Sequence, residues 1–263
     1  MGTVTYRDGI AILQLVVFPF VFAAALFIWK RAGWKAGRKI WRFAPVLALI
    51  RITGSICTLL TISHDSYNLE VAVAVCELIG IAPLLLTYVG ILRQIDIDAT
   101  VNPKFLNLLA AACFIGVGLG IAGVSTANDS DSTYHPNDIV KASMGVFLTV
   151  FAVVVVVCGL LYLKLRNTLR VFQQKLFLAS ALSYPFLLAR LVYSALSDYT
   201  SWSNFAVLVG EPTIYLCMSV LEEIIAIVLA MLLGILAVLQ DDFVKSDSKP
   251  AYQQFELREE VST

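Results

Sequence analysis

The chain has 263 residues, of which 59% are hydrophobic and 14% charged, and its formal net charge is zero. Soluble domains carry about 25% charged residues, so this composition excludes an ordinary soluble enzyme, and the charge balance gives no reason to expect nucleic-acid binding. Seven apolar segments, each long enough to cross a bilayer as a helix, fill most of the chain. We therefore expect an all-α protein with a seven-transmembrane helix bundle at 1–240 and a disordered tail at 241–263.

In chain order, the expected spans lie near residues 10–29, 43–62, 69–92, 105–124, 139–163, 176–196 and 213–239. The first apolar segment ends in Trp29-Lys30-Arg31 and follows no basic segment, so we interpret it as a span and not as a cleaved signal peptide. The tail beyond the last span is polar and has few large apolar residues, which is typical of a disordered extension.

The basic residues predict an orientation. Segment 30–42 holds six Lys and Arg residues. If the chain crosses the membrane seven times, fifteen basic residues lie on the same side as this segment. The loops on the other side hold one basic residue, Arg7, because Lys141 lies within the start of the fifth span. The positive-inside rule then predicts an outer N-terminus and a cytosolic C-terminus. Asn128, in an Asn-Asp-Ser sequence, becomes a candidate glycosylation site on the outer side. We favour the endoplasmic reticulum or another endomembrane over the plasma membrane.

Five ionisable residues interrupt four of the spans: Arg51, Glu77, Arg190, Glu222 and Glu223. A charge at mid-bilayer costs about 2.5–3.5 kcal/mol on insertion scales. Residue counts from the span ends place all five in one layer, roughly 9–17 Å below the outer surface. They are open to a structural interpretation, in which arginines and glutamates pair between helices, and to a functional one, in which they line a polar pocket. In both, each arginine is expected within salt-bridge or one-water distance of a buried carboxylate.

The two adjacent glutamates point about 100° apart on a helix, so one can face a pocket while the other pairs with an arginine. A carboxyl group without a cation in this environment would stay protonated and could donate its proton. We therefore take Glu77, Glu222 and Glu223 as candidate catalytic acids, and Arg51, Arg190, Tyr184 and Tyr193 as candidate substrate-binding residues. The chain has no Walker, HExxH, GxSxG or DDxxD motif and no lysine in the seventh span, so we expect neither a metal site nor a cofactor.

Four segments resemble a family of uncharacterised seven-span integral membrane proteins of filamentous fungi. They are LIRITGS (49–55), ELIGIAPLLL (77–86), YPFLLARLVYS (184–194) and LEE (221–223). With the span pattern, this resemblance covers nearly the whole chain, and it implies a fold but no reaction. A weaker, architectural similarity links the chain to fungal membrane-bound meroterpenoid and terpene cyclases, which use carboxylic acids on an early and a late helix. Glu77 and Glu222 or Glu223 occupy comparable places.

Two functions stay open at this point. The first is a metal-independent, membrane-bound terpene cyclase of fungal secondary metabolism, an isomerase or lyase in which a neutral glutamate protonates an isoprenoid chain. The second is a seven-helix receptor, lipid sensor or small-molecule transporter. In both, the partner is a hydrophobic small molecule within the lipid bilayer, and neither function involves nucleic acid.

Overall fold

The structure, a computed structural model, describes residues 5–33, 37, 40–62, 67–97, 100–125, 137–200 and 211–243. The regular elements within these ranges are helices, with no strand among them. They are α1 (Tyr6–Ala32), α3 (Phe43–Thr61), α4 (Tyr67–Ile95), α5 (Pro103–Ser125), α6 (Asp138–Leu165), α7 (Val171–Tyr199), α8 (Pro212–Tyr215), the π-helical η2 (Leu216–Val220) and α9 (Leu221–Val238). The last three form one continuous span, which gives 7 helical segments long and apolar enough to cross a membrane. The predicted all-α, seven-helix architecture of a multi-pass membrane protein is confirmed.

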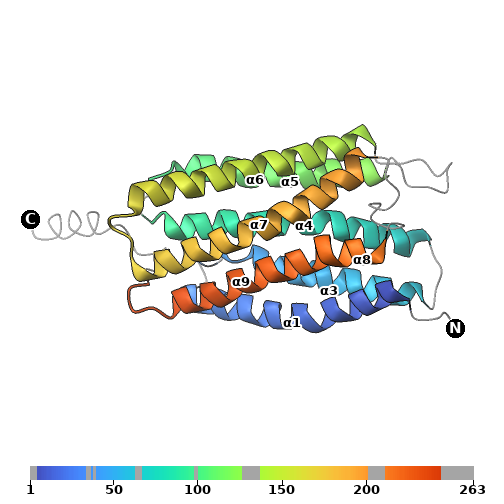
Figure 1. The fold of residues 1–263 in the computed structure, drawn as a ribbon, viewed down its shortest axis with the longest axis horizontal. Coiled ribbons are helices and arrows are strands. Elements are labelled where there is room, and N and C mark those ends of the chain that lie inside the picture. Colours follow the sequence, from blue (N-terminus) through green and yellow to red (C-terminus); the bar gives the residue numbers. More distant parts are fainter. Residues whose placement is uncertain are drawn as a thin grey trace, which may run out of the picture.

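The helices lie side by side in one elongated bundle (Figure 1). Helices α5 and α6 pack together along one side, α1 and α3 along the other, and α4, α7 and α9 lie between them. Helix α4 is the central element, because 72% of its most apolar stretch is buried against 28% for α5. The close neighbours of the last span are α7 and α1. Side chains on α3, α4, α7 and α9 that point inward therefore meet in the middle of the bundle.

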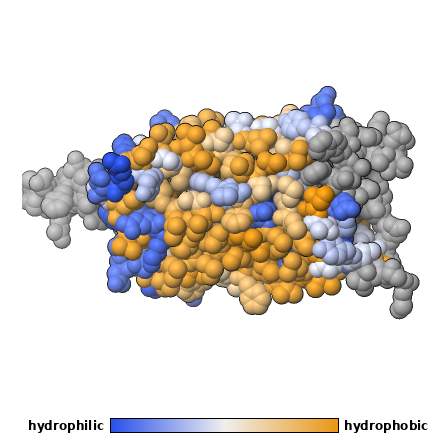
Figure 2. All heavy atoms as spheres, viewed as in Figure 1, coloured by the Kyte–Doolittle hydropathy of each residue, from blue (hydrophilic) through white to orange (hydrophobic). Residues whose placement is uncertain are grey.

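The outer surface fits a lipid environment. Large apolar side chains face outward on several helices, among them Phe20, Leu108 and Leu160, which are 75%, 65% and 62% exposed. Figure 2 shows apolar residues around the middle of the visible face and hydrophilic ones towards its two ends. Such a broad apolar surface on a water-soluble protein would be an aggregation site, whereas in a bilayer it contacts acyl chains.

Small residues allow α5 to pack closely against α6 and α4. A Cβ atom at Gly116 of α5 would lie 2.8 Å from the Phe147 ring of α6, and one at Gly120 would lie 2.3 Å from a Leu78 methyl group of α4. Ser143 of α6 donates a hydrogen bond to the Gly116 carbonyl oxygen at 2.7 Å. Small residues and interhelical hydrogen bonds are the usual means of helix association in membranes, where lipid removes the hydrophobic drive between helices.

The start of α1 and the end of α9 lie at opposite ends of the bundle (Figure 1). At the second of these ends, Asp242 accepts a hydrogen bond from the Val171 N–H at 2.7 Å, so the residues after α9 cap the start of α7. Phe243 packs edge-on against Phe172, with ring centroids 5.6 Å apart. Asn128 and residues 244–263 lie outside the described residues, so the glycosylation site and the disordered tail stay predictions.

Candidate functional site

Arg51 and Glu223 form the tightest polar contact between spans. The Arg51 Nε donates to Glu223 Oε1 at 2.5 Å, and Nη2 donates to Glu223 Oε2. Both side chains are 2% exposed. Two parallel N–H···O bonds match the guanidinium fork to the carboxylate plane and fix α3 against α9. The contact joins residues 172 positions apart in the chain.

The backbone of α4 leaves room for this pair. A Cβ atom at Gly80 would lie 2.7 Å from Arg51 Nη2 and 2.9 Å from Cζ. Only a residue without a side chain lets the guanidinium lie this close to α4. The other flank is polar: the Ser55 hydroxyl lies 2.8 Å from the Arg51 carbonyl oxygen and 3.1 Å from Gln14 Oε1 of α1. Arg51 is therefore enclosed by three helices besides its own.

Glu77 of α4 connects the two arginines. Its Oε1 atom lies 2.8 Å from Arg51 Nη1 and accepts a hydrogen bond from the Tyr215 hydroxyl at 2.5 Å. Its Oε2 atom lies 3.5 Å from Arg190 Nη2. Arg190 Nε in turn lies 3.5 Å from Glu223 Oε2, and Nη1 donates to Ser194 Oγ at 2.6 Å.

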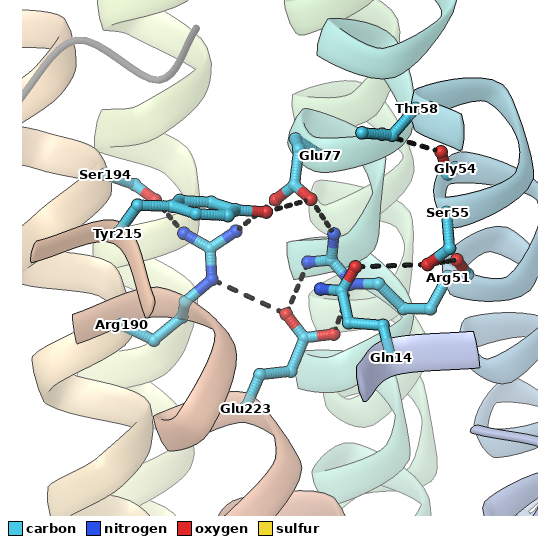
Figure 3. A network of polar contacts seen from close by, with 10 residues as sticks. All are labelled: Gln14, Arg51, Gly54, Ser55, Thr58, Glu77, Arg190, Ser194, Tyr215 and Glu223. Atoms are coloured by element: carbon cyan, nitrogen blue, oxygen red, sulfur yellow. Dashed lines mark hydrogen bonds and ion pairs between the residues drawn. The ribbon is translucent and has the colours of Figure 1, made fainter. Parts of the chain in front are cut away.

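Arg51, Glu77, Arg190 and Glu223 thus form a closed ring of alternating charges from α3, α4, α7 and α9, which we name the four-charge cluster (Figure 3). Two guanidinium groups face two carboxylates, so the formal charges cancel. The expectation that each arginine lies within salt-bridge distance of a buried carboxylate is confirmed. Mutual neutralisation is what allows four ionisable side chains to lie this deep in a bundle.

The two sides of this cluster differ in completeness. On the Arg51 side, both contacts to carboxylates are short. On the Arg190 side, both ion pairs are 3.5 Å long, beyond the usual range of about 2.7–3.2 Å for an N–H···O hydrogen bond. Arg190 Nε and Glu77 Oε2 are buried and have no hydrogen-bond partner within the described residues. We name these two atoms, with Arg190 Nη2, the open side of the cluster.

Glu222 lies outside the cluster. No ion pair or hydrogen bond joins it to the four charges in the described part of the chain, and its side chain is partly exposed. The one-residue offset from Glu223 turns it about 100° around the helix. Its Oε2 atom is nevertheless buried and without a hydrogen-bond partner. The sequence left open which of the two adjacent glutamates pairs with an arginine, and in the structure it is Glu223.

The two predicted tyrosines have different surroundings. Tyr193 is 1% exposed and packs on the Tyr215 ring, with centroids 6.3 Å apart, so it borders the cluster through Tyr215. Tyr184 packs instead against Tyr88 and Phe151, at centroid distances of 5.9 and 6.1 Å. It contributes to an aromatic group nearer the other end of α7 and makes no described contact with the four charges.

Sequence reasoning did not identify Tyr215 or Gln14 as members of the site. Tyr215 precedes Glu223 by eight positions, which on an α-helix would place the two side chains about 80° apart. Between them η2 forms a π turn, in which the Leu221 N–H bonds to the Leu216 carbonyl oxygen five residues earlier. A π turn takes up about one extra residue, which brings Tyr215 and Glu223 to nearly the same face. Such turns often occur at functional sites.

The structure brings together no group of three or more His, Cys, Asp and Glu side chains with metal-binding geometry among the described residues. The polar groups of the cluster are instead suited to hydrogen bonding and to charge recognition.

Comparison with known proteins places the whole bundle in one family. A search of curated proteins found no significant match, and a search of solved structures found none either. The model of a protein family described as "Domain of unknown function (DUF7702)" matches residues 4–240, which include all seven spans and every member of the four-charge cluster. Because this match covers most of the chain, the protein belongs to the DUF7702 family.

Proposed function

We propose that this protein binds a hydrophobic small molecule within the membrane and acts as a receptor or lipid sensor. The ligand's polar group docks at the open side of the cluster. The observation that supports this best is the pair of buried, unpartnered atoms, Arg190 Nε and Glu77 Oε2. Buried polar atoms nearly always have partners. A donor and an acceptor that lack them at the same place are suited to receive a ligand.

The arrangement of charges favours binding over acid catalysis at the cluster. Acid catalysis requires a group that carries a proton and releases it to the substrate. Glu77 and Glu223 each contact both guanidinium groups, so they are arranged as carboxylates. The same contacts join four helices, and a ligand that competes for Arg190 or Glu77 would change how these helices pack. Differential contacts of this kind are what a sensor needs to shift between conformations.

The proposal can be tested with purified protein in lipid nanodiscs. Hydrophobic compounds with different polar groups would be screened for stabilisation against thermal unfolding. A compound at 100 times its Kd should add about 2.7 kcal/mol to the free energy of unfolding. Arg190→Gln should abolish this response, and the exposed Arg166→Gln should keep it as a matched control. Absence of any stabilising compound, or an unchanged response in Arg190→Gln, would contradict the proposal.

The terpene cyclase stays a second candidate, and one observation favours it. Glu222 carries a buried carboxyl oxygen without a hydrogen-bond partner in the described chain and lies next to a cluster member. A neutral Glu222 could protonate an isoprenoid chain lying against α9. Product formation from prenylated substrates should then fall by roughly two to four orders of magnitude in Glu222→Gln. Parallel Glu77→Gln and Glu223→Gln variants test the other two acids, and full turnover per folded molecule in all three would eliminate acid catalysis.

We also propose that the end of the bundle where α9 finishes faces the cytosol. The described basic residues around this end are Lys30, Arg31, Arg42, Arg93, Lys104, Lys164, Arg166, Arg170 and Lys175. Those towards the other end are Arg7 and Lys141, and the positive-inside rule gives the orientation. A tag after Thr263 should be digested by protease added to sealed microsomes, and Asn128 should accept a glycan. Protection of the tag would reverse the orientation.

A further inference from the structure

We infer that the ligand presents a neutral hydroxyl group to the open side of the cluster, where the hydroxyl accepts a hydrogen bond from Arg190 and donates one to Glu77 Oε2. This inference rests on the proposed binding function and specifies its ligand class: an apolar alcohol, such as a long-chain alcohol, a prenol or a sterol. It follows from the unused atoms, which are one donor and one acceptor. A hydroxyl is the smallest group that satisfies both.

The Nη1 group of Arg190 and the Oε1 atom of Glu77 are already occupied. Ser194 takes the Nη1 group of Arg190 at 2.6 Å. The Nη2 and Nε groups then point towards the carboxylates of Glu77 and Glu223, each at 3.5 Å. Tyr215 donates to the Oε1 atom of Glu77, so Oε2 is the oxygen that remains. The unused donor, Nε, thus faces Glu223, and the unused acceptor, Glu77 Oε2, lies beside Nη2 of the same guanidinium (Figure 3).

Charge balance within the four-charge cluster disfavours an ionised ligand group. The two arginines and two glutamates cancel, and Arg190 and Glu223 are 4% and 2% exposed. A carboxylate or phosphate would leave this buried site with an excess negative charge, and an ammonium would leave an excess positive one. Uncompensated charge at this depth is strongly unfavourable. A hydroxyl leaves the balance unchanged.

Hydrogen-bond stoichiometry excludes a group that only accepts. An ether or ester oxygen could accept from Arg190 but would leave Glu77 Oε2 buried and unpaired. A site that hydrogen-bonds a hydroxyl discriminates strongly against the analogue without it, because its own polar group is left unsatisfied. We expect a methyl ether to bind on the order of 10- to 100-fold more weakly than its parent alcohol.

Equilibrium binding in nanodiscs of zwitterionic lipid tests the inference. The probes are 1-dodecanol, farnesol and cholesterol, each compared with its methyl ether, and dodecanoate and dodecylammonium as the charged counterparts of the first. At least one alcohol should bind saturably, its ether 10- to 100-fold more weakly, and the two ions no better than the ether. Equal binding of an alcohol and its ether, or tighter binding of either ion, overturns the hydroxyl assignment while leaving the binding function intact. Saturable binding by none of the compounds overturns both, with water as the partner of the two atoms.

Ser194 provides a variant with little risk to folding. We assign it as a positioning residue, because it holds the Arg190 guanidinium and does not itself complete the open side. Ser194→Ala should weaken alcohol and ether binding alike, by about 10-fold, because both oxygens accept from Arg190, and it should leave the alcohol-to-ether ratio unchanged. Ser180→Ala is the matched control, since this buried serine of the same helix donates to the Leu176 carbonyl oxygen and makes no contact with Arg190 in the described chain. Alcohol and ether affinities that both stay at their wild-type values in Ser194→Ala overturn this assignment.

Discussion

Arg51 and Arg190 occupy equivalent places in one ring of charges, yet their guanidinium groups are used differently. Arg51 makes a two-pronged contact with Glu223 and a 2.8 Å contact with Glu77. Arg190 reaches the same two carboxylates only at 3.5 Å and leaves its Nε without a hydrogen bond in the described chain. The first arrangement is that of a structural link between helices, and the second leaves the atoms that we propose contact a ligand. Buried charge alone does not separate these two arrangements, whereas the completeness of its hydrogen bonding does.

The largest difference between the two sides should appear when each arginine is removed. Arg51→Met leaves Glu223 buried with only the long contact to Arg190, and should cost about 3–5 kcal/mol of unfolding free energy. Arg190→Met should cost less, because fewer short contacts are lost. Unfolding in a single detergent, with exposed Arg166→Met as a control within about 0.5 kcal/mol of wild type, provides the measurement. Equal costs for both arginines would remove the distinction between the two sides.

Removing the Tyr215 hydroxyl should have a smaller effect, which acts through Glu77 Oε1, the oxygen that also contacts Arg51. Tyr215→Phe deletes a hydrogen bond to a charged carboxylate, which is worth about 1.5–3 kcal/mol. Tyr184→Phe is the matched control: its ring packs with Tyr88 and Phe151 and its hydroxyl contacts none of the four charges in the described chain, so its loss should leave the cluster intact. Both variants can be compared in the same unfolding assay. A cost in Tyr184→Phe that matches that of Tyr215→Phe would show that the loss reflects tyrosine packing and not the bond to Glu77.

The smallest expected change concerns the space beside Arg51. Gly80→Ala introduces a Cβ atom 2.7 Å from Arg51 Nη2, which forces the guanidinium away from its position against Glu223 and should cost about 1–3 kcal/mol. Gly118→Ala is the control, since nothing lies within 4 Å of a Cβ atom there. The replacement at Gly118 should be neutral or slightly stabilising because alanine favours the helix. A neutral Gly80→Ala would mean that the Arg51 side is less tightly packed than its distances indicate.

Much of the architecture could be predicted from residue types and counts. Apolar segment length alone determines how many helices can cross a bilayer, and counting along the spans placed Arg51, Glu77, Arg190 and Glu223 in one layer. The same reasoning predicted arginine–glutamate pairing, because unpaired charges are too costly there. It did not determine whether Glu222 or Glu223 pairs with an arginine, because the rotation of a helix about its axis cannot be read from the sequence.

Other features depend on packing that no local pattern reveals. Gly80 is one of many glycines in the chain, and only the approach of Arg51 distinguishes it. Tyr184 precedes Arg190 by six positions, but its ring packs in an aromatic group with Tyr88. Nothing in the residue spacing marks Tyr215, because α-helical counting turns it about 80° from Glu223 and a π turn cannot be recognised from spacing.

That π turn also has a consequence for chain length. In an ordinary α-helix, two side chains seven positions apart lie on nearly the same face. Tyr215 and Glu223 are eight positions apart, and the π turn takes up the extra residue. Loss of one residue between positions 216 and 220 would therefore convert η2 into ordinary α-helix and still leave both side chains directed at the four-charge cluster. The same loss between Glu223 and the end of α9 would instead rotate every later residue by about 100° against α1 and α7. A one-residue deletion in η2 should therefore shorten the last span without changing the direction of the Tyr215 and Glu223 side chains.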